Sequence, residues 1–225
     1  QANYSAKNIK TKEGKMFFDV IIKIKSSPKL LTIKNVSIVM PGEYNVRNAV
    51  GAVAVAHQLG IKNDNIKEGL KTFTGVERRF SIIDKIKGIS IIDDYAHHPT
   101  EIVNTLDAAR SICDGKIIAI FQPHRFSRLN NLFEKFINSF FNADTVFVTE
   151  IYAAGEKNIP NLDQKKIRDS MLKIGHKDVR LLNNFDKLAD ELLVLCKSGD
   201  FVIFLGAGSI SSIAKKVTWQ LKKII

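Results

Sequence analysis

The sequence has only two cysteines, Cys113 and Cys196, among its 225 residues. Two are too few for a disulfide framework, and they lack the C-x-x-C spacing of a metal knuckle. No apolar run approaches the roughly 18 residues that a membrane-spanning helix needs, and the longest candidates, such as Phe201 to Leu205, have the length of a strand. We therefore expect a soluble protein of the reducing cytoplasm, with no membrane partner.

The sequence also lacks an initiating methionine and the charged-then-apolar pattern of a signal peptide. Its first residue is Gln1. We therefore expect this sequence to be a piece of a longer chain.

Acidic residues are in the minority, with 23 Asp and Glu against 34 Lys and Arg and a formal net charge of +11. The lysines are scattered, which is typical of a solvated surface. The sequence lacks the interleaved basic and aromatic stripe that would favour a nucleic acid partner. A nucleic-acid-binding module is the weaker alternative. Four of the eight arginines form two pairs, Arg78 with Arg79 and Arg125 with Arg128. Guanidinium groups bind phosphate or carboxylate in a bidentate manner, so these pairs predict an anionic ligand.

From about residue 88 onward, short β-branched runs alternate with helix-length amphipathic segments. This alternation predicts an α/β fold, a doubly wound and mainly parallel sheet with helices on both faces. The expected strands are Ile89 to Ile92, Lys116 to Phe121, Thr145 to Thr149, Val179 to Leu182 and Phe201 to Leu205.

Two helices of this region carry clear signals. Apolar residues from Leu129 to Phe141 recur at helical spacing and predict one long helix. Another helix is expected to begin at Pro99, with Ile102, Val103, Leu106 and Ala109 facing inward. In doubly wound sheets ligands lie beyond the carboxyl ends of the strands. The loops expected there are residues 93–99, 122–128 and 150–156.

The first eighty residues differ in pattern. Residues 17–24 and 31–39 predict a two-stranded hairpin around a turn at Ser26, Ser27 and Pro28. Two helices are expected to follow, over residues 45–59 and 66–73. Two strands and two helices bury too little surface for an independent domain. We therefore expect residues 1–76 to be the end of one domain and residues 77–225 to be a complete second domain.

Six segments taken in this order resemble the Mur ligase family, and within it the members that add L-alanine to UDP-N-acetylmuramate. Members that reattach a recycled tripeptide share part of the pattern and remain an alternative. The segments are PGEYNVRNAVGAVAVAHQLGI (41–61), GVERRF (75–80), DDYAHHPTEI (93–102), FQPHRFSR (121–128), YAAGE (152–156) and FLGAGSIS (204–211).

The resemblance implies a ligase with a UDP-sugar domain, a central ATP-binding domain and a C-terminal doubly wound domain. Residues 77–225 correspond to the last of these and residues 1–76 to the end of the central one. The phosphate-binding pattern G-x-x-x-x-G-K-[ST] does not occur in the sequence. The ligands of Mg²⁺ are expected upstream, and the chain is expected to be inactive alone.

The resemblance assigns three residues to ATP. Asn45 would read the adenine edge, although the residue before it is Tyr44 where the family usually has histidine, and Asn45 could instead cap the helix that follows. Arg79 would reach the phosphates. Asp94 would accept hydrogen bonds from the ribose hydroxyls.

The resemblance places the other substrates around two histidine-containing loops. Tyr95 and His97 would face the muramoyl carboxylate or the incoming alanine, while His98 would fix its loop by hydrogen bonding. A metal site of a phosphohydrolase is the alternative, but adjacent side chains in an extended segment before proline point to opposite sides.

His124, Arg125 and Arg128 would hold the alanine carboxylate and the lactoyl group at a helix N-terminus. A buried salt-bridge network is the alternative for this cluster. Tyr152 and Glu156 are candidates for the pocket wall or for loop support.

The implied reaction activates the lactoyl carboxylate with ATP to give an acyl phosphate, which the amine of L-alanine then attacks. The candidate catalytic residues are Arg79, His97, His124, Arg125 and Arg128, since charge develops on phosphoryl oxygens and the amine must be neutral. The turn at residues 206–209 lacks the third glycine of a dinucleotide fingerprint, so we expect it to pack a strand tightly against a helix.

Overall fold

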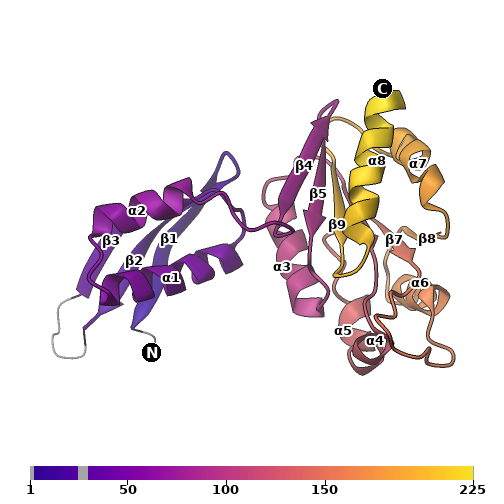
Figure 1. Ribbon diagram of the computed structural model, residues 1–225, viewed down its shortest axis with the longest axis horizontal. Helices are drawn as coiled ribbons and strands as arrows, with labels where there is room; N and C mark the ends of the chain where they lie inside the picture. The colour runs from indigo at the N-terminus through magenta and orange to yellow at the C-terminus, as the bar shows by residue number, and fades with distance from the viewer. Residues whose placement is uncertain (1–2, 25–29, 225) are drawn as a thin grey trace. The chain divides into compact units, whose positions relative to one another are not determined.

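The computed structural model describes residues 3–24 and 30–224. The chain forms two compact units, residues 1–75 and 76–225 (Figure 1). This division falls one residue before the expected boundary. The turn expected at residues 26–28 lies outside the described residues.

The first unit is an antiparallel sheet covered by two helices. Residues of strand β2 alternate between the two faces, so that Met16, Phe18, Val20 and Ile22 are buried while their neighbours are not. These four side chains pack with β3 and with the helices in one apolar core. The elements are β1 (Tyr4–Lys12), β2 (Lys15–Lys23), β3 (Leu30–Ile38), α1 (Glu43–Gln58) and α2 (Asn63–Thr72), with sheet order β1-β2-β3.

Strand β1 corrects the expected two-stranded hairpin. Its residues are half-buried or exposed and rich in lysine, so the strand leaves no apolar alternation in the sequence. The three strands and two helices share one apolar core, and the expected count of two strands is wrong. The expectation that residues 1–76 are the end of a larger domain stays a prediction.

The second unit contains a six-stranded sheet in the order β4-β5-β9-β6-β7-β8. Strand β4 runs antiparallel to β5, and the other neighbours are parallel, which confirms the doubly wound, mainly parallel fold. The sequence pattern missed β4, an edge strand with a single buried residue, Ile86. The strands are β4 (Ser81–Ile86), β5 (Ile89–Asp94), β6 (Ile117–Phe121), β7 (Thr145–Thr149), β8 (Val179–Leu182) and β9 (Phe201–Leu205).

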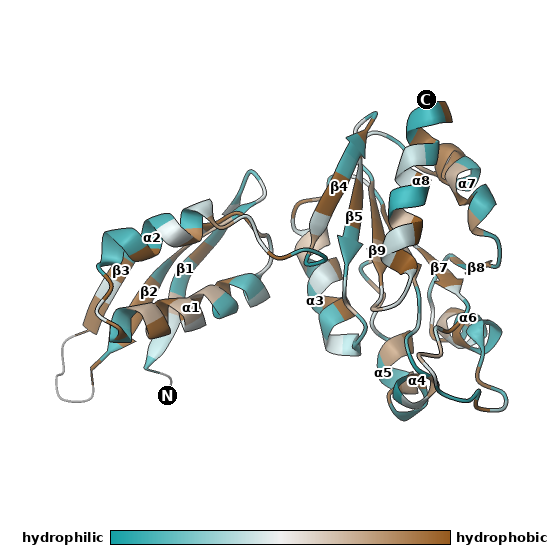
Figure 2. Ribbon diagram, in the orientation of Figure 1, coloured by the Kyte–Doolittle hydropathy of each residue, from teal (hydrophilic) through white to brown (hydrophobic). Residues whose placement is uncertain are grey.

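Helices cover both faces of this sheet. One set of strand residues, including Ile91 and Ile120, packs against α7 and α8. The alternate residues Ile92, Ala119 and Ile203 are fully buried as well, and the central strands are strongly hydrophobic in Figure 2. The helices are α3 (Pro99–Arg110), α4 (Phe126–Asn131), α5 (Phe133–Ile137), α6 (Gln164–Lys173), α7 (Leu188–Leu195) and α8 (Ile210–Ile224), with a 3₁₀ turn η1 (Phe185–Lys187).

The expected long helix over residues 129–141 is wrong. Leu132 has φ −123° and ψ 21°, outside the helical region, and divides the segment into α4 and α5. Phe136, Ile137 and Phe140 are buried as the stripe predicts, but Phe141 is exposed. In α3, which does begin at Pro99, Val103 is exposed rather than inward.

The carboxyl ends of four strands lie at one edge of the sheet. Asp94 pairs with Leu205, Leu205 with Phe121, and Phe121 with Val148. Asp93 and Asp94 therefore belong to β5 and not to the loop expected there. The loops after β5, β6, β7 and β9 start at the same level and can build one site.

No helix among the described residues is long and apolar enough to cross a membrane.

Candidate functional site

Four rings form a continuous row at this edge of the sheet. Tyr95 and His97 follow β5, His124 follows β6, and Tyr152 follows β7. The ring centroids are 5.0 Å apart for Tyr95 and His97, 6.1 Å for His97 and His124, and 5.3 Å for His124 and Tyr152. The structure thus brings together the residues that the sequence placed on three separate loops.

The β5 loop, residues 95–98, is held by the start of helix α3. His98 is the N-cap, and its Nδ1 accepts a hydrogen bond from Thr100 N (3.3 Å). Glu101 completes a capping box, because its Oε2 accepts from the backbone N–H groups of His97 (3.1 Å) and His98 (3.2 Å). The prediction that His98 fixes its loop is confirmed.

Glu101 also joins two of the predicted site residues. Its Oε1 lies 3.5 Å from Arg79 Nη1, and its Oε2 lies 3.4 Å from His97 Nδ1. Burial would raise the pKa of Glu101, but the hydrogen bond from His97 N and the charges of His97 and Arg79 lower it overall. Glu101 is therefore an anion between a guanidinium and an imidazole.

Asp94 lies beneath this loop and is 1% exposed. Its two oxygens accept hydrogen bonds from Phe80 N (2.8 Å) and Ala96 N (2.7 Å). Burial raises the pKa of Asp94 to about 6, against these hydrogen bonds and the charge of Arg79, which lower it. Asp94 therefore ties the chain before β4 to the loop after β5, and its contact with a ribose stays a prediction.

The β6 loop, residues 122–125, is joined to the loop after β7 by backbone hydrogen bonds. Tyr152 N donates to Pro123 O (2.8 Å), and Arg125 N donates to Tyr152 O (2.9 Å). The Tyr152 ring stacks on His124 at an interplanar angle of 15°. The ring of Tyr152 therefore packs against His124, and its backbone supports the β6 loop, which is one of the two roles expected of Tyr152.

Arg128 fixes the other side of His124. Its Nη1 lies 3.3 Å from both Nδ1 and the carbonyl oxygen of His124. Burial and the charges of Arg128, His97 and Arg125 lower the pKa of His124. In the described part of the chain neither Arg125 nor Arg128 forms a salt bridge, so the alternative of a buried salt-bridge network is not what the structure shows.

Arg125 is exposed and stands at the N-cap of α4 with φ 70°. This helix has six residues and is not the long helix expected, and the binding of an anion at its start stays a prediction. Any anion bound here would rest on the guanidinium groups. Glu156 supports the same turn, since its carboxylate accepts from Ser127 N (2.9 Å) and Ser127 Oγ (2.7 Å).

The turn at residues 206–209 forms the floor of the site. Arg78 Nη2 donates to Gly206 O (2.6 Å), and Gln122 binds the turn through Ser209 Oγ (3.2 Å) and Ile210 N (3.2 Å). A Cβ at residue 208 would lie 2.7 Å from Tyr152 Cγ, so glycine is required there by close packing. The predicted packing role of this turn is confirmed.

Residues 78–208 match the protein family described as Mur ligase, glutamate ligase domain. The chain belongs to the Mur ligase family. UDP-N-acetylmuramate–L-alanine ligase of Agrobacterium fabrum is 41% identical over 224 residues, which cover 100% of this chain and 48% of that relative. The ligase of the same name from Bartonella henselae is 42% identical over 221 residues, 98% of this chain and 46% of the relative. The chain therefore spans about half the length of these relatives.

Solved Mur ligases have the same fold. UDP-N-acetylmuramate–alanine ligase MurC of Thermotoga maritima superposes with a TM-score of 0.81 at 28% identity and covers 100% of this chain and 47% of that one. A murein peptide ligase of Psychrobacter arcticus superposes with a TM-score of 0.66 at 23% identity, covering 100% of this chain and 45% of that one, and supports the fold alone.

In this Mur ligase chain, Asn45 belongs to the first unit and not to the row of rings. It lies in the first turn of α1, whose N-cap is Gly42, so the alternative of an Asn45 cap is wrong. Its Nδ2 donates to Pro41 O (2.8 Å).

Three sets of contacts in the candidate site were missed from the sequence: those of Glu101, Gln122 and Arg78. Glu101 could have been found, because it stands three residues after His98 at the spacing of a capping box. The second is Gln122, whose partners are 87 and 88 residues away along the chain. Arg78 pairs with the buried Asp93 (Nε to Oδ2, 3.5 Å) and lies 4.7 Å from the Tyr95 ring centre. These distant pairings leave no signal in local spacing.

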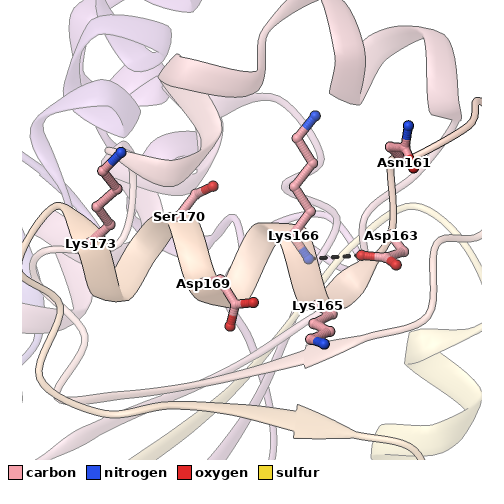
Figure 3. A pocket seen from close by; sticks show the side chains of 7 residues that line it. All are labelled: Asn161, Asp163, Lys165, Lys166, Asp169, Ser170 and Lys173. Carbon is pink, nitrogen blue, oxygen red and sulfur yellow. Dashed lines mark hydrogen bonds between the residues drawn. The ribbon is translucent and has the colours of Figure 1, made fainter.

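Among the described residues, neither a cluster of metal-binding side chains nor the hollow along α6 provides an additional site. No group of three or more His, Cys, Asp or Glu side chains among them could hold a metal ion. Figure 3 shows a hollow of about 460 Å³ along α6, where Lys166 and Lys173 extend to one side and Lys165 and Asp169 to the other. Its charges are of both signs and do not converge on one point.

Proposed function

We propose that this chain is the part of a UDP-N-acetylmuramate–L-alanine ligase that holds the incoming amino acid. The observation that carries the proposal is the 41% identity to such ligases over the whole chain, combined with a row of imidazoles flanked by arginines at the carboxyl edge of the sheet. The whole protein would join L-alanine to the lactoyl carboxylate of UDP-N-acetylmuramate through an acyl phosphate formed from ATP.

The β5 loop and the β6 loop would contact different groups of the substrates, because their charged side chains differ. Arg125 and Arg128 form no salt bridge within the described chain, so their guanidinium groups are available to the carboxylate of L-alanine. His124 stays neutral beside them, because burial and the neighbouring cations lower its pKa. His97 and Tyr95 would face the reacting end of the substrates. A carboxylate held this way leaves the amine oriented for attack.

ATP would bind through Arg79 at its phosphates, with Asn45 and Asp94 as the proposed adenine and ribose contacts. Arg79 is about half exposed, and its only ion pair in the described chain is with Glu101, so it can reach a phosphate. No group of three or more His, Cys, Asp or Glu side chains in the described part of the chain could hold a metal ion, and the ligands of Mg²⁺ would come from upstream of this sequence. A protein that uses ATP and a UDP-sugar would work in the cytoplasm.

The test uses the complete gene product that carries this sequence. With ATP, UDP-N-acetylmuramate and L-alanine together, we expect ADP, phosphate and the alanyl product, detected by mass spectrometry, and no ADP when any one substrate is omitted. Formation of product from the tripeptide but not from L-alanine would contradict the proposal that L-alanine is the substrate. ADP formation that does not depend on L-alanine or on the tripeptide would contradict the proposed function itself.

A further inference from the structure

Arg78 is largely buried, with 25% of its side chain exposed, and it connects three segments at the carboxyl edge of the sheet. Its Nη2 donates to Gly206 O (2.6 Å) in the turn after β9, and its own carbonyl oxygen accepts from Tyr95 N (2.7 Å) after β5. Its guanidinium carbon lies 4.7 Å from the centre of the Tyr95 ring. Arg78 therefore contacts Tyr95 through both its backbone and its side chain, and connects it to the floor of the site.

The guanidinium group of Arg78 is paired with a buried carboxylate. Oδ2 of Asp93 lies 3.5 Å from Arg78 Nε and accepts a hydrogen bond from Ser211 Oγ (2.6 Å), and the side chain of Asp93 is only 5% exposed. Oδ1 of Asp93 is buried and has no hydrogen-bond partner among the described residues. Because a buried carboxylate without a cation is unfavourable, Asp93 holds the guanidinium group of Arg78 beside the Tyr95 ring.

The backbone around Arg78 depends on such contacts. Arg78 has φ 59° and Phe80 has φ 48°, both in the left-handed region that residues other than glycine rarely adopt. These conformations persist where the surrounding contacts fix them. The neighbouring Arg79 differs, because its side chain is 47% exposed and its one ion pair in the described chain is with Glu101. Arg79 can therefore turn to a ligand, whereas the guanidinium group of Arg78 is engaged by groups of the protein itself.

We propose that Arg78 is a positioning residue whose guanidinium group, held by Asp93 and Gly206, fixes the ring of Tyr95 for substrate binding. The inference rests on the proposed function, in which Tyr95 faces UDP-N-acetylmuramate or L-alanine. Arg78 contacts no substrate and acts only through Tyr95. The two adjacent arginines thus have separate roles, since Arg79 serves ATP and Arg78 serves the geometry of the site.

Hydrogen exchange in the complete gene product, followed by mass spectrometry, tests the positioning without any substrate. Arg78→Gln removes the charge and the guanidinium plane, so the amides of residues 95–98 should exchange at least about fivefold faster than in the unchanged protein. Arg168→Gln is the matched control, because in the described chain Arg168 pairs only with its neighbour Asp169. The control should leave this segment as it is. Unaltered exchange of residues 95–98 in Arg78→Gln would overturn the inference.

Steady-state kinetics of the same protein tests whether Arg78 acts through Tyr95. Tyr95→Leu should raise the KM of the substrate that the ring contacts, UDP-N-acetylmuramate or L-alanine, about tenfold. Arg78→Gln should raise the same KM about fivefold while the ATP KM changes less than about twofold. In the Tyr95→Leu protein, adding Arg78→Gln should change that KM less than about twofold, because the ring through which Arg78 acts is gone. A purely structural defect would add to the effect of Tyr95→Leu and would raise the ATP KM as well.

A second variant serves if Arg78→Gln alone does not fold. Combining it with Asp93→Asn removes both buried charges and keeps an acceptor for Ser211, and the double variant carries the same expectations. Additive KM effects of the Tyr95 and Arg78 changes, an ATP KM that rises as much, or a Tyr95→Leu protein with neither KM raised overturns this inference alone. An unchanged protein that makes no product overturns the proposed function, and the substrate role of Arg78 with it.

Discussion

The β5 loop and the β6 loop each bring one histidine to the same row of rings, but they hold it by groups of opposite charge. Carboxylates anchor the β5 loop, with Asp94 beneath it and Glu101 beside His97. Guanidinium groups flank the β6 loop, where Arg128 meets His124. The comparison shows how the neighbours of an imidazole decide which nitrogen carries the hydrogen, because Tyr95 O and Glu101 accept at Nδ1 of His97 whereas Arg128 donates to Nδ1 of His124.

The largest expected effect comes from removing the buried anchor of the β5 loop. Asp94→Ala leaves the backbone N–H groups of Phe80 and Ala96 without their acceptors, which should lower the free energy of unfolding by about 2 to 4 kcal/mol. Urea unfolding of the 225-residue chain measures this difference. The exposed Asp114→Ala serves as the control and should unfold at nearly the same urea concentration as the unchanged chain. Equal midpoints for both variants would show that Asp94 does not anchor the loop.

The same carboxyl predicts a pH dependence. Its pKa is raised from 3.8 to about 6 in the folded chain, so the folded state binds the proton more tightly than the unfolded state. This contribution to stability is fully present below pH 3.8 and is lost as the pH rises through 6. Between pH 4 and 7 the unchanged chain should lose about 1 to 3 kcal/mol relative to Asp94→Asn. Parallel curves of unfolding free energy against pH for the two chains would contradict this assignment.

In the β6 loop, Arg128→Ala in the complete gene product tests whether the guanidinium group of Arg128 binds the alanine carboxylate. The variant loses a charged hydrogen-bond donor to the amino acid carboxylate, so the alanine KM should rise about 10- to 100-fold while the ATP KM changes less than about twofold. Steady-state kinetics with each substrate varied in turn gives both values. Arg110→Ala is the matched control, because Arg110 binds Gly115 O and Asn142 O at the end of α3. Equal increases in the two KM values for Arg128→Ala would contradict the assignment of Arg128 to the alanine carboxylate.

A smaller effect is expected at the end of the row of rings, where Tyr152 after β7 stacks on His124. Tyr152→Leu removes the stack on His124, a contact of about 1 kcal/mol, and should raise the alanine KM about fivefold. Tyr152→Phe keeps the ring and should behave like the unchanged protein. The stack has no part in holding His124 if leucine and phenylalanine give the same KM.

Much of this fold could be predicted from the sequence, and the failures have physical causes. Four of the five parallel strands were recognisable as short buried runs such as Val202 to Leu205, whereas β8 is buried only at Val179 and Leu182. Strands β1 and β4 were missed because edge strands with exposed residues leave no apolar pattern. The division at Leu132 was also missed, since backbone dihedrals at one residue do not alter the spacing of apolar side chains.

The site was predictable in its residues more than in its contacts. The histidines and arginines of both loops were identified from motifs, and the structure brings His97, His124 and Arg128 together. Gln122 was not, because its partners Ser209 and Ile210 become its neighbours only when the sheet is assembled. Glu101 was overlooked, although its capping-box spacing after His98 is local. The burial of Asp94 likewise depends on tertiary packing that no local spacing reveals.

Nitrogen-15 NMR of the histidine rings tests the central contrast most directly. In the 225-residue chain at pH 8, where neutral rings dominate, we predict that His97 carries its hydrogen on Nδ1 and that His124 carries it on Nε2. The single variants of each histidine assign the signals. Finding the hydrogen on the same nitrogen in both rings would contradict the account, because Nδ1 of His97 lies against the acceptors Tyr95 O and Glu101 Oε2, whereas Nδ1 of His124 lies against the donor Arg128 Nη1.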